Sequence, residues 1–293
     1  RLLPCYRRRS SGRRFGRVTK THSDRVFAVI TAAGSGTRLG SDRPKALVDL
    51  EGMSLVERAL RNLHAGGVAF SIITAPPAHL DEFNEALSSP ELRAISRVVP
   101  GSPLSRQASV AAGLDALAEI LGEDTAARKG ALSASHSTAS AVGEDTPVLI
   151  HDAARPLVSA QLVRRVIEAL RSGEKAVIPG LPVSDTLKSF RLIDEAAAGE
   201  SSSARYVDAT VDRSGLVAVQ TPQGFPWSVI RELHRGAASF GNSEETALTD
   251  DAGLAQSAGI PVRIVPGEGR ALKITTPIDL VFARAILAGG AQA

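Results

Sequence analysis

This sequence has a single cysteine, no long apolar run and, in its N-terminal tail, no apolar stretch of the kind that a secretory signal carries. Cys5 is the only cysteine among 293 residues, so the body of the chain has no disulfide, thiolate metal site or cysteine nucleophile. The longest apolar runs, such as Val26 to Ala33, are far shorter than the ~20 residues that a membrane-spanning helix needs. We therefore expect no membrane span, and we expect a cytoplasmic location unless the N-terminal segment directs the chain elsewhere.

Acidic residues are absent from the first 23 positions, which carry seven Arg and one Lys. Subtracting these eight from the 34 basic residues leaves 26 against 31 acidic residues, a net charge of −5 for the remainder. We interpret residues 1–24 as a disordered basic tail, with a plastid transit peptide as the alternative. Because the body has no basic excess to neutralise a phosphate backbone, we expect no nucleic-acid partner.

From residue 25 onward, short β-prone apolar runs alternate with segments of helical period. This pattern predicts an α/β fold with a mostly parallel sheet flanked by helices, in a single domain over residues 25–290. The expected strands are Val26 to Thr31, Val68 to Ala75, Arg97 to Pro100, Val148 to His151, Ala176 to Pro179, Val262 to Val265 and Ala271 to Thr275. The expected helices contain Leu55 to Leu63, Leu80 to Leu87, Val110 to Leu121, Pro226 to Phe240, Thr249 to Ala258 and Pro277 to Leu287.

Two stretches interrupt this alternation. Residues 122–146 are rich in Ala and Ser and longer than an ordinary connection, so we predict a disordered surface insertion. Residues 183–216 contain β-prone pieces on both sides of an Ala/Ser/Glu-rich tip, which predicts a projecting β-hairpin arm. Since a projecting hairpin with apolar side chains usually packs on something, we expect the arm to contact a partner subunit.

A glycine-rich loop directly follows the first expected strand, with the sequence Ala32-Ala33-Gly34-Ser35-Gly36-Thr37-Arg38. Its place at the carboxyl end of a strand is where open α/β sheets bind ligands. Gly34 and Gly36 allow the backbone to approach a phosphate group closely. Arg38 and Lys45 add two cations, so the segment suits a bound triphosphate, whereas a plain glycine turn with solvated cations is the alternative.

The spacing of this loop differs from the two common phosphate-binding motifs. A dinucleotide fingerprint requires Gly at the position that Leu39 occupies, and a P-loop requires a Gly-Lys-Ser/Thr sequence that is missing here. The loop therefore predicts a nucleotide site of another class.

The strand ending at His151-Asp152 places a carboxylate at the same edge of the sheet. Asp152 can accept a hydrogen bond from a ribose or substrate hydroxyl, or hold a water molecule bound to Mg²⁺. A role in a turn or a helix cap is the alternative. Alternation along the strand points His151 the other way, so we expect it to be structural. Arg155 is suited equally to a phosphate and to a salt bridge.

Six further motifs follow the glycine-rich loop in a fixed order, and together they point to one enzyme family. They are His151-Asp152-Ala153-Ala154-Arg155-Pro156, Asp185-Thr186-Leu187-Lys188, Thr210-Val211-Asp212-Arg213, Thr221-Pro222-Gln223, Thr249-Asp250-Asp251 and Lys273-Ile274-Thr275. Together with the opening loop, this order resembles the 2-C-methyl-D-erythritol 4-phosphate cytidylyltransferase family of the non-mevalonate isoprenoid pathway. The resemblance covers about Val26 to Ala288.

The resemblance implies a Rossmann-like nucleotidyltransferase fold, CTP and methylerythritol phosphate as substrates, Mg²⁺ as cofactor and a homodimer with interlocking arms. It implies charge stabilisation at the α-phosphate by Arg38 and Lys45, and positioning of the attacking phosphate by Arg213 and Lys273. The residues matching the nucleotide site are Ala32, Ala33, Gly34, Gly36, Gly101, Ser109 and Asp152. Those matching the methylerythritol phosphate site are Arg155, Thr186, Thr221 and Thr249, and no protein ligand of the metal is assigned.

The sequence departs from the family pattern near the pocket. Ala46 and Leu47 follow Lys45 where an aromatic-rich segment is usual, Leu272 precedes Lys273 where a polar residue is common, and Ser102 stands where an acidic residue can occur. These changes affect details of substrate packing but leave the cations intact. A cytidylyltransferase for another polyol phosphate, such as ribitol 5-phosphate, resembles this family in its first half and is the alternative, although the motifs His151 to Pro156 and Thr210 to Arg213 favour methylerythritol phosphate. A non-catalytic nucleotide- or RNA-binding module is a more distant alternative.

Overall fold

The structure is a computed structural model that describes residues 25–34, 43–122, 143–195, 202–237 and 250–290. Several predictions fall on other parts of the chain: the basic tail of residues 1–24, most of the 122–146 insertion, the tip of the arm, Gly36, Arg38 and Thr249. They lie outside the described residues.

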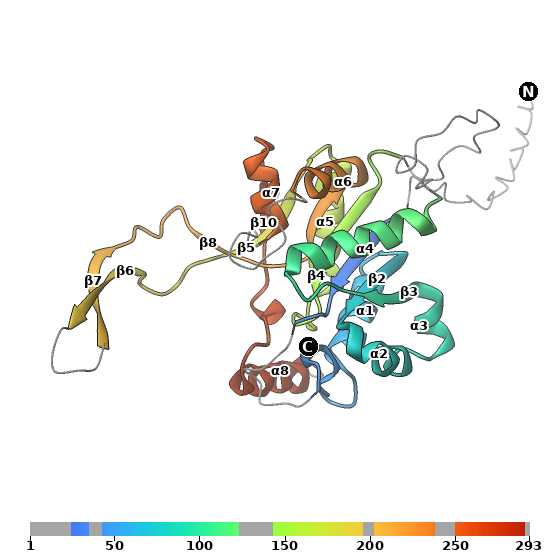
Figure 1. Cartoon of the computed structure of the whole chain (residues 1–293), viewed down its shortest axis with the longest axis horizontal. Coiled ribbons are helices and arrows are strands. Elements are labelled where there is room, and N and C mark those ends of the chain that lie inside the picture. The colour runs from blue at the N-terminus through green and yellow to red at the C-terminus, as the bar shows by residue number, and fades with distance from the viewer. Residues whose placement is uncertain (1–24, 35–42, 123–142, 196–201, 238–249, 291–293) are drawn as a thin grey trace, which may run out of the picture.

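The centre of the molecule is a mostly parallel β-sheet, as predicted (Figure 1). Its strand order is β10-β5-β9-β4-β1-β2-β3, with β8 paired to β5. Strands β9 and β8 run antiparallel to their neighbours, and the other pairs are parallel. The strands are β1 (Phe27–Thr31), β2 (Phe70–Ala75), β3 (Ser96–Pro100), β4 (Pro147–Asp152), β5 (Val177–Pro182), β8 (Val217–Val219), β9 (Gln223–Pro226) and β10 (Arg263–Pro266).

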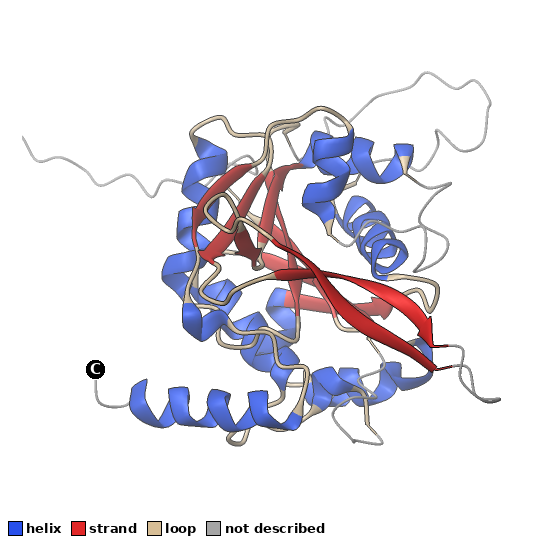
Figure 2. Ribbon diagram, turned by 90° about the vertical axis from the view of Figure 1, so that its left-hand side faces the viewer, coloured by secondary structure: helices blue, strands red, loops and turns tan. Residues whose placement is uncertain are grey.

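Helices cover both faces of this sheet (Figure 2). The side chains of Ala28 and Ile30 pack on one face with α1 (Leu55–Ala65), α2 (Leu80–Ala86), α3 (Pro90–Ile95) and α5 (Ala160–Arg171). The side chains of Phe27 and Val29 pack on the other face with α4 (Arg106–Ile120), α6 (Trp227–Gly236) and α7 (Asp251–Ser257). This alternation follows from the period of two along a strand, and burial on both sides explains the continuous apolar runs in the sequence.

A smaller apolar cluster supports the C-terminal helix α8 (Pro277–Gly290). Ala283 packs there against Leu50, Leu55, Leu157 and Ile274. None of the described helices is long and apolar enough to cross a membrane.

The predicted strand Ala271 to Thr275 is wrong. Ala271 ends the short 3₁₀ helix Gly269–Ala271, and the chain then runs extended without pairing to a strand of the sheet. Its β-prone residues are instead fixed by burial of Ile274 and by a hydrogen bond from Ile274 N to Ala154 O of 2.8 Å.

The predicted β-hairpin arm is present and projects from the body (Figure 1). It consists of β6 (Lys188–Glu195) and β7 (Ser202–Thr210), which form a separate antiparallel sheet. The chain enters the arm after β5 and returns through β8, which pairs with β5. The arm is therefore anchored at its root by the main sheet.

Candidate active site

A pocket of about 500 Å³ lies at the carboxyl ends of β1 and β4. Thr31 at the end of β1 is the register partner of Asp152 at the end of β4, so the glycine loop and the acidic strand end lie side by side. The described lining residues are Thr31, Ala32, Ala33, Gly34, Lys45, Ala46, Ser102, Pro103, Ser105, Arg106, Ser109, Asp152, Ala153, Ala154, Lys273 and Thr275. The structure thus brings together seven of the predicted catalytic and binding residues, namely Ala32, Ala33, Gly34, Lys45, Ser109, Asp152 and Lys273.

One wall of the pocket combines small side chains with backbone. Gly101 lies directly behind this wall, because a Cβ added there would be 2.9 Å from the Ala33 Cβ and 3.3 Å from Ser109 Oγ. Ser109 Oγ accepts a hydrogen bond of 3.0 Å from the Ser102 N–H, which fixes the turn before α4. This part of the pocket wall, here called the small-residue slot, therefore consists of small side chains and backbone.

Lys45 and Lys273 reach the pocket from segments far apart in sequence. Lys45 begins the 3₁₀ helix Lys45–Leu47. Lys273 lies on the loop before α8, which is held by hydrogen bonds in both directions between the Gln220 side chain and the backbone of Glu268, each 2.9 Å long. The cation at this edge therefore sits on a supported backbone.

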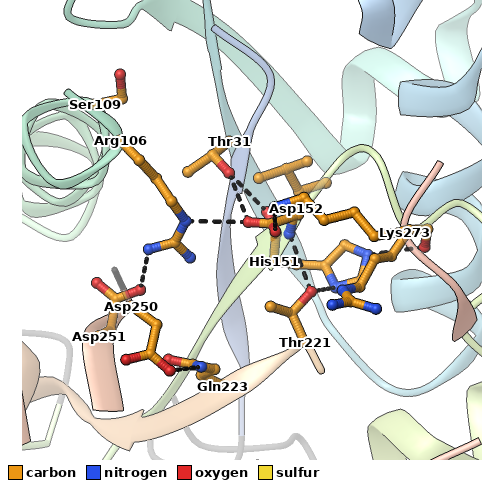
Figure 3. A network of polar contacts seen from close by, with 12 residues as sticks. Thr31, Arg106, Ser109, His151, Asp152, Thr221, Gln223, Asp250, Asp251 and Lys273 are labelled. Carbon is orange, nitrogen blue, oxygen red and sulfur yellow. Dashed lines mark hydrogen bonds and ion pairs between the residues drawn. The ribbon is translucent and has the colours of Figure 1, made fainter. Parts of the chain in front are cut away.

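Asp152 is the only carboxylate among the described lining residues, and both of its oxygens have partners. Its Oδ2 atom lies 2.9 Å from Lys273 Nζ, and its Oδ1 atom accepts from Arg106 Nε at 3.1 Å and from the Thr31 hydroxyl at 3.2 Å (Figure 3). Burial alone would raise the pKa of the Asp152 carboxyl, but Arg106 and Lys273 hold that pKa well below its usual range. Asp152 is therefore an anion at any physiological pH.

Arg106 also contacts Asp251, a pairing that sequence analysis missed. Arg106 Nη1 lies 2.7 Å from Asp251 Oδ2 (Figure 3). The other oxygen of Asp251 lies 2.9 Å from His234 Nε2. Burial opposes ionisation of Asp251, yet the charge of Arg106 and the hydrogen bond with His234 lower its pKa to about 2. No signal for this pairing was found in the sequence, where the expected helix ran from Val110 to Leu121 and Arg106 had no assigned role.

His151 has a structural environment, in agreement with the direction predicted from strand alternation. It is fully buried, with Nδ1 2.9 Å from the Thr221 hydroxyl and Nε2 3.2 Å from Arg155 O. The Thr221 Oγ1 atom in turn accepts from the Asp152 N–H at 3.2 Å. Thr221, predicted to lie near the acceptor, is thus buried behind the strand end that carries Asp152.

The Arg155 guanidinium binds backbone rather than a carboxylate. Its Nη1 donates to Ala271 O at 2.8 Å and its Nη2 to Val219 O at 3.1 Å. Arg155 therefore links the Lys273 loop to the root of the arm. Neither the predicted phosphate contact nor the predicted salt bridge describes this role. Thr186 and Arg213 lie exposed in the arm segment and do not line the pocket of their own chain.

Within the described ranges, no cluster of three or more His, Cys, Asp or Glu side chains could hold a metal ion. Asp152 is thus the one carboxylate of the described lining that could contribute to a metal site, together with donors from a bound substrate.

Comparison with known proteins gives a consistent assignment. A family model described as 2-C-methyl-D-erythritol 4-phosphate cytidylyltransferase matches residues 129–289, and a MobA-like NTP transferase domain matches residues 28–185. Enzymes named 2-C-methyl-D-erythritol 4-phosphate cytidylyltransferase from Rhodococcus jostii and Saccharopolyspora erythraea are 39% and 40% identical to this chain. These matches cover 91% and 90% of the chain and 97% and 99% of the relatives.

Solved structures agree with the sequence relatives. The crystal structure of the cytidylyltransferase of the same name from Thermus thermophilus is 32% identical, with a TM-score of 0.60 over 90% of this chain and 99% of that one. The fold, the enzyme class and the predicted resemblance are thereby confirmed. The chain belongs to the 2-C-methyl-D-erythritol 4-phosphate cytidylyltransferase family and is a nucleotidyltransferase of the non-mevalonate isoprenoid pathway.

Proposed function

We propose that the pocket binds CTP and that a phosphate oxygen of 2-C-methyl-D-erythritol 4-phosphate attacks the α-phosphorus. The new P–O bond forms as the bond between the α-phosphorus and the bridging oxygen breaks, which releases pyrophosphate. The observation that carries this proposal is the convergence of Lys45 and Lys273 on one pocket beside the small-residue slot of Ala33 and Ser109.

The residues around the reacting groups supply charge neutralisation rather than covalent chemistry. Both substrates are anions, so catalysis depends on positioning and electrostatics. We assign Lys45 and Arg38 to the α-phosphate of CTP, and Lys273 and Arg213 to the attacking phosphate. That phosphate monoester is ionised at neutral pH, which makes a general base unnecessary and agrees with the enclosed position of His151.

The base and ribose fit the opposite wall. We assign the cytosine to the slot formed by Ala32, Ala33, Gly101 and Ser109, and the triphosphate to the loop containing Gly34 and Gly36. We assign Asp152 to orienting the ribose or a metal-bound water. The acceptor side comprises Arg155, Thr186, Thr221 and Thr249, where Thr221 and Arg155 act by shaping the backbone that they hold.

We propose Mg²⁺ as the divalent cation of the reaction. Mg²⁺ is usually bound through one or two carboxylates together with substrate phosphates. Asp152 with the triphosphate fits that donor set, and the ion would neutralise negative charge on CTP. Turnover that is lost with a chelator and restored by Mg²⁺, with no effect of added Ca²⁺, would support this choice of metal.

We propose a homodimer in which the arm contacts a second copy of the chain. The arm exposes Phe190, Leu192 and Val207, which the strand register places on one face of the hairpin. Exposed apolar side chains on an isolated two-stranded hairpin favour association, because such a hairpin gains little stability alone. Thr186 and Arg213 lie on the same projecting segment, so a partner could carry them toward an acceptor site.

Pyrophosphate release tests the reaction directly. The purified chain is mixed with CTP and either methylerythritol phosphate or ribitol 5-phosphate, and then with ATP, GTP or UTP in place of CTP. Turnover is expected with CTP and methylerythritol phosphate. Preference for ribitol 5-phosphate would establish the alternative acceptor, and the absence of turnover with every pair would favour a binding module.

Substitution of Lys45 tests the assignment of the pocket. The Lys45→Ala variant is expected to lower kcat by roughly 10²-fold, the scale of losing one preorganised electrostatic contact. Lys175→Ala is the matched control, because Lys175 pairs with Asp145 on the surface and does not line the pocket. Wild-type turnover in Lys45→Ala would remove this residue from the mechanism.

A further inference from the structure

Arg106 occupies a position that its helix does not favour. It is the first residue of α4, directly after Ser105, whose side chain caps the helix by accepting from Ala108 N. The N-terminal end of a helix carries partial positive charge, so a cation in the first turn is destabilising by about 0.3–1 kcal/mol when exposed. The helix itself therefore gives no reason for an arginine at this position. The reason must lie in the contacts that its side chain makes.

The Arg106 guanidinium bridges two carboxylates from different elements. Nε contacts Asp152 at the end of β4, and Nη1 contacts Asp251 in the first turn of α7 (Figure 3). Asp251 is 1% exposed and is held from its other side by His234 of α6. Two donors in a rigid fork reach two acceptors at once, which a lysine ammonium does not reproduce.

The two sides of Asp152 differ as a result. The Oδ1 side faces Arg106 and is enclosed by α4, α6 and α7, whereas the Oδ2 side faces Lys273, whose side chain is 45% exposed. Asp251 does not line the pocket, so its link to the pocket runs through Arg106. The buried pair of Asp251 and His234 thus acts as a fixed support for the carboxylate in the pocket wall.

We infer that Arg106 is a positioning residue for the proposed CMP transfer, holding Asp152 so that its second oxygen and Lys273 face the bound nucleotide. This inference rests on the proposed function. Arg106 also balances charge, because Arg106 and Lys273 offset Asp152 and Asp251. Loss of Arg106 leaves the Asp152 carboxylate less neutralised beside a triphosphate, an effect that also runs through Asp152 and weakens CTP binding as well as orientation.

Two variants of Arg106 test this inference in the pyrophosphate-release assay. Arg106→Gln is expected to lower kcat/KM for CTP at least tenfold, with a rise in KM for CTP and little change in KM for the acceptor. Arg106→Lys keeps the charge but cannot span both carboxylates, and at least a fivefold loss is expected. Calorimetric titration with CTP should show the same loss of affinity in the absence of turnover.

A double-mutant cycle separates positioning from general destabilisation. If Arg106 acts through Asp152, then adding Arg106→Gln to Asp152→Asn should cost less than threefold beyond Asp152→Asn alone. Equal costs in both backgrounds would overturn the inference, as would wild-type kinetics in either variant of Arg106. Should Arg106→Gln fail to fold, the same cycle is run with Arg106→Lys, and the same outcomes decide.

Arg231→Gln provides the matched control. The Arg231 side chain is 15% exposed, pairs with Asp115 at 2.7 Å and stacks on Trp227, but does not line the pocket. Its loss should lower the melting temperature while leaving kcat/KM within twofold of the wild type. Turnover of the wild-type chain in the same assay distinguishes failure of this inference from failure of the proposed function.

Discussion

Two adjacent residues at the end of β4 are held in different charge states, one neutral and one anionic. His151 is enclosed by the core, and burial lowers its pKa from 6.5 to about 4, so the imidazole is neutral at pH 7. Asp152 is held as an anion by Arg106 and Lys273. One residue therefore supports the strand end while its neighbour supplies charge to the pocket.

The buried His151 predicts a dependence of stability on pH. Its folded pKa lies below its unfolded value, so the unfolded chain binds more protons between about pH 6.5 and pH 4. The free energy of unfolding should therefore fall by up to about 3 kcal/mol as the pH decreases through this window. Urea unfolding at intervals across the window measures the slope.

Histidine variants identify the source of that slope. His151→Gln cannot take up the proton, so its stability should change less with pH than that of the wild type. His79→Gln is the control, because His79 lies on a partly exposed turn and pairs with Glu82. Identical slopes in wild type and His151→Gln would show that another group causes the effect.

Gly101 is predicted to have no room for a side chain. A methyl group there would lie 2.9 Å from the Ala33 Cβ and 3.3 Å from the Ala75 carbonyl oxygen, which forces the wall of the pocket to move. Gly101→Ala should destabilise the fold by about 1–3 kcal/mol and raise KM for CTP several-fold. In Gly236→Ala the new methyl group meets nothing within 4 Å, and both quantities should stay near wild type.

At this scale, sequence analysis located residues that depend on local context. Asp152 and the glycine loop follow strands, and their place at the edge of the sheet could be predicted from the parallel pattern. The pairing of Arg106 with Asp251 joins positions 145 residues apart and depends on how α4 and α7 each pack against α6. The period of apolar residues carries no information about such a contact. It also does not predict that Arg155 bridges two carbonyl groups.

Among the described elements, the arm exposes apolar side chains on a hairpin that projects from the body of its own chain. Val207 is 64% exposed and is the register partner of Phe190, beside Leu192. If this face packs on a second copy, then Val207→Asp places a charge in an apolar contact and should raise the dimer Kd at least tenfold. Analytical ultracentrifugation across a concentration series measures this constant.

A body variant provides the comparison for the arm. Ile264→Asp alters an exposed side chain of β10 that is 51% accessible and lies outside the arm, so the dimer Kd should not change. A wild-type chain that sediments as a monomer at all concentrations would contradict the proposed role of the arm.

The helices and strands were predictable to the extent that burial imposes a pattern. Strand β1, buried on both faces, appears as a continuous apolar run. Strand β9 was missed because four residues, Gln223–Pro226, are too short to show a period, and Pro226 looked like the start of a helix. Helix α5 also went unassigned, although its apolar residues recur at helical spacing on a face covering the sheet.

For the whole molecule, charge is divided between the body and the first 23 residues. The body has a net charge of −5. Every described residue that lines the pocket lies at position 31 or later, outside the basic segment. A chain beginning at residue 25 should therefore keep kcat/KM within about twofold of the full sequence. A loss above tenfold in the pyrophosphate assay would show that the tail takes part in the reaction.

The route of the chain into and out of the arm has a consequence for how the family can change in length. Gly180 of β5 pairs with Val219 of β8, and Gln220 N donates to Pro179 O at 2.8 Å, so the excursion begins and ends at one point. Each doubling of a closed loop costs only about 0.6 kcal/mol in closure entropy. Insertions and deletions at the far end are therefore nearly neutral for the body, whereas the root, which Arg155 and Gln220 tie to the Lys273 loop, is constrained. The length of the far end of the arm can therefore be changed in an engineered variant while the residues at its root are kept.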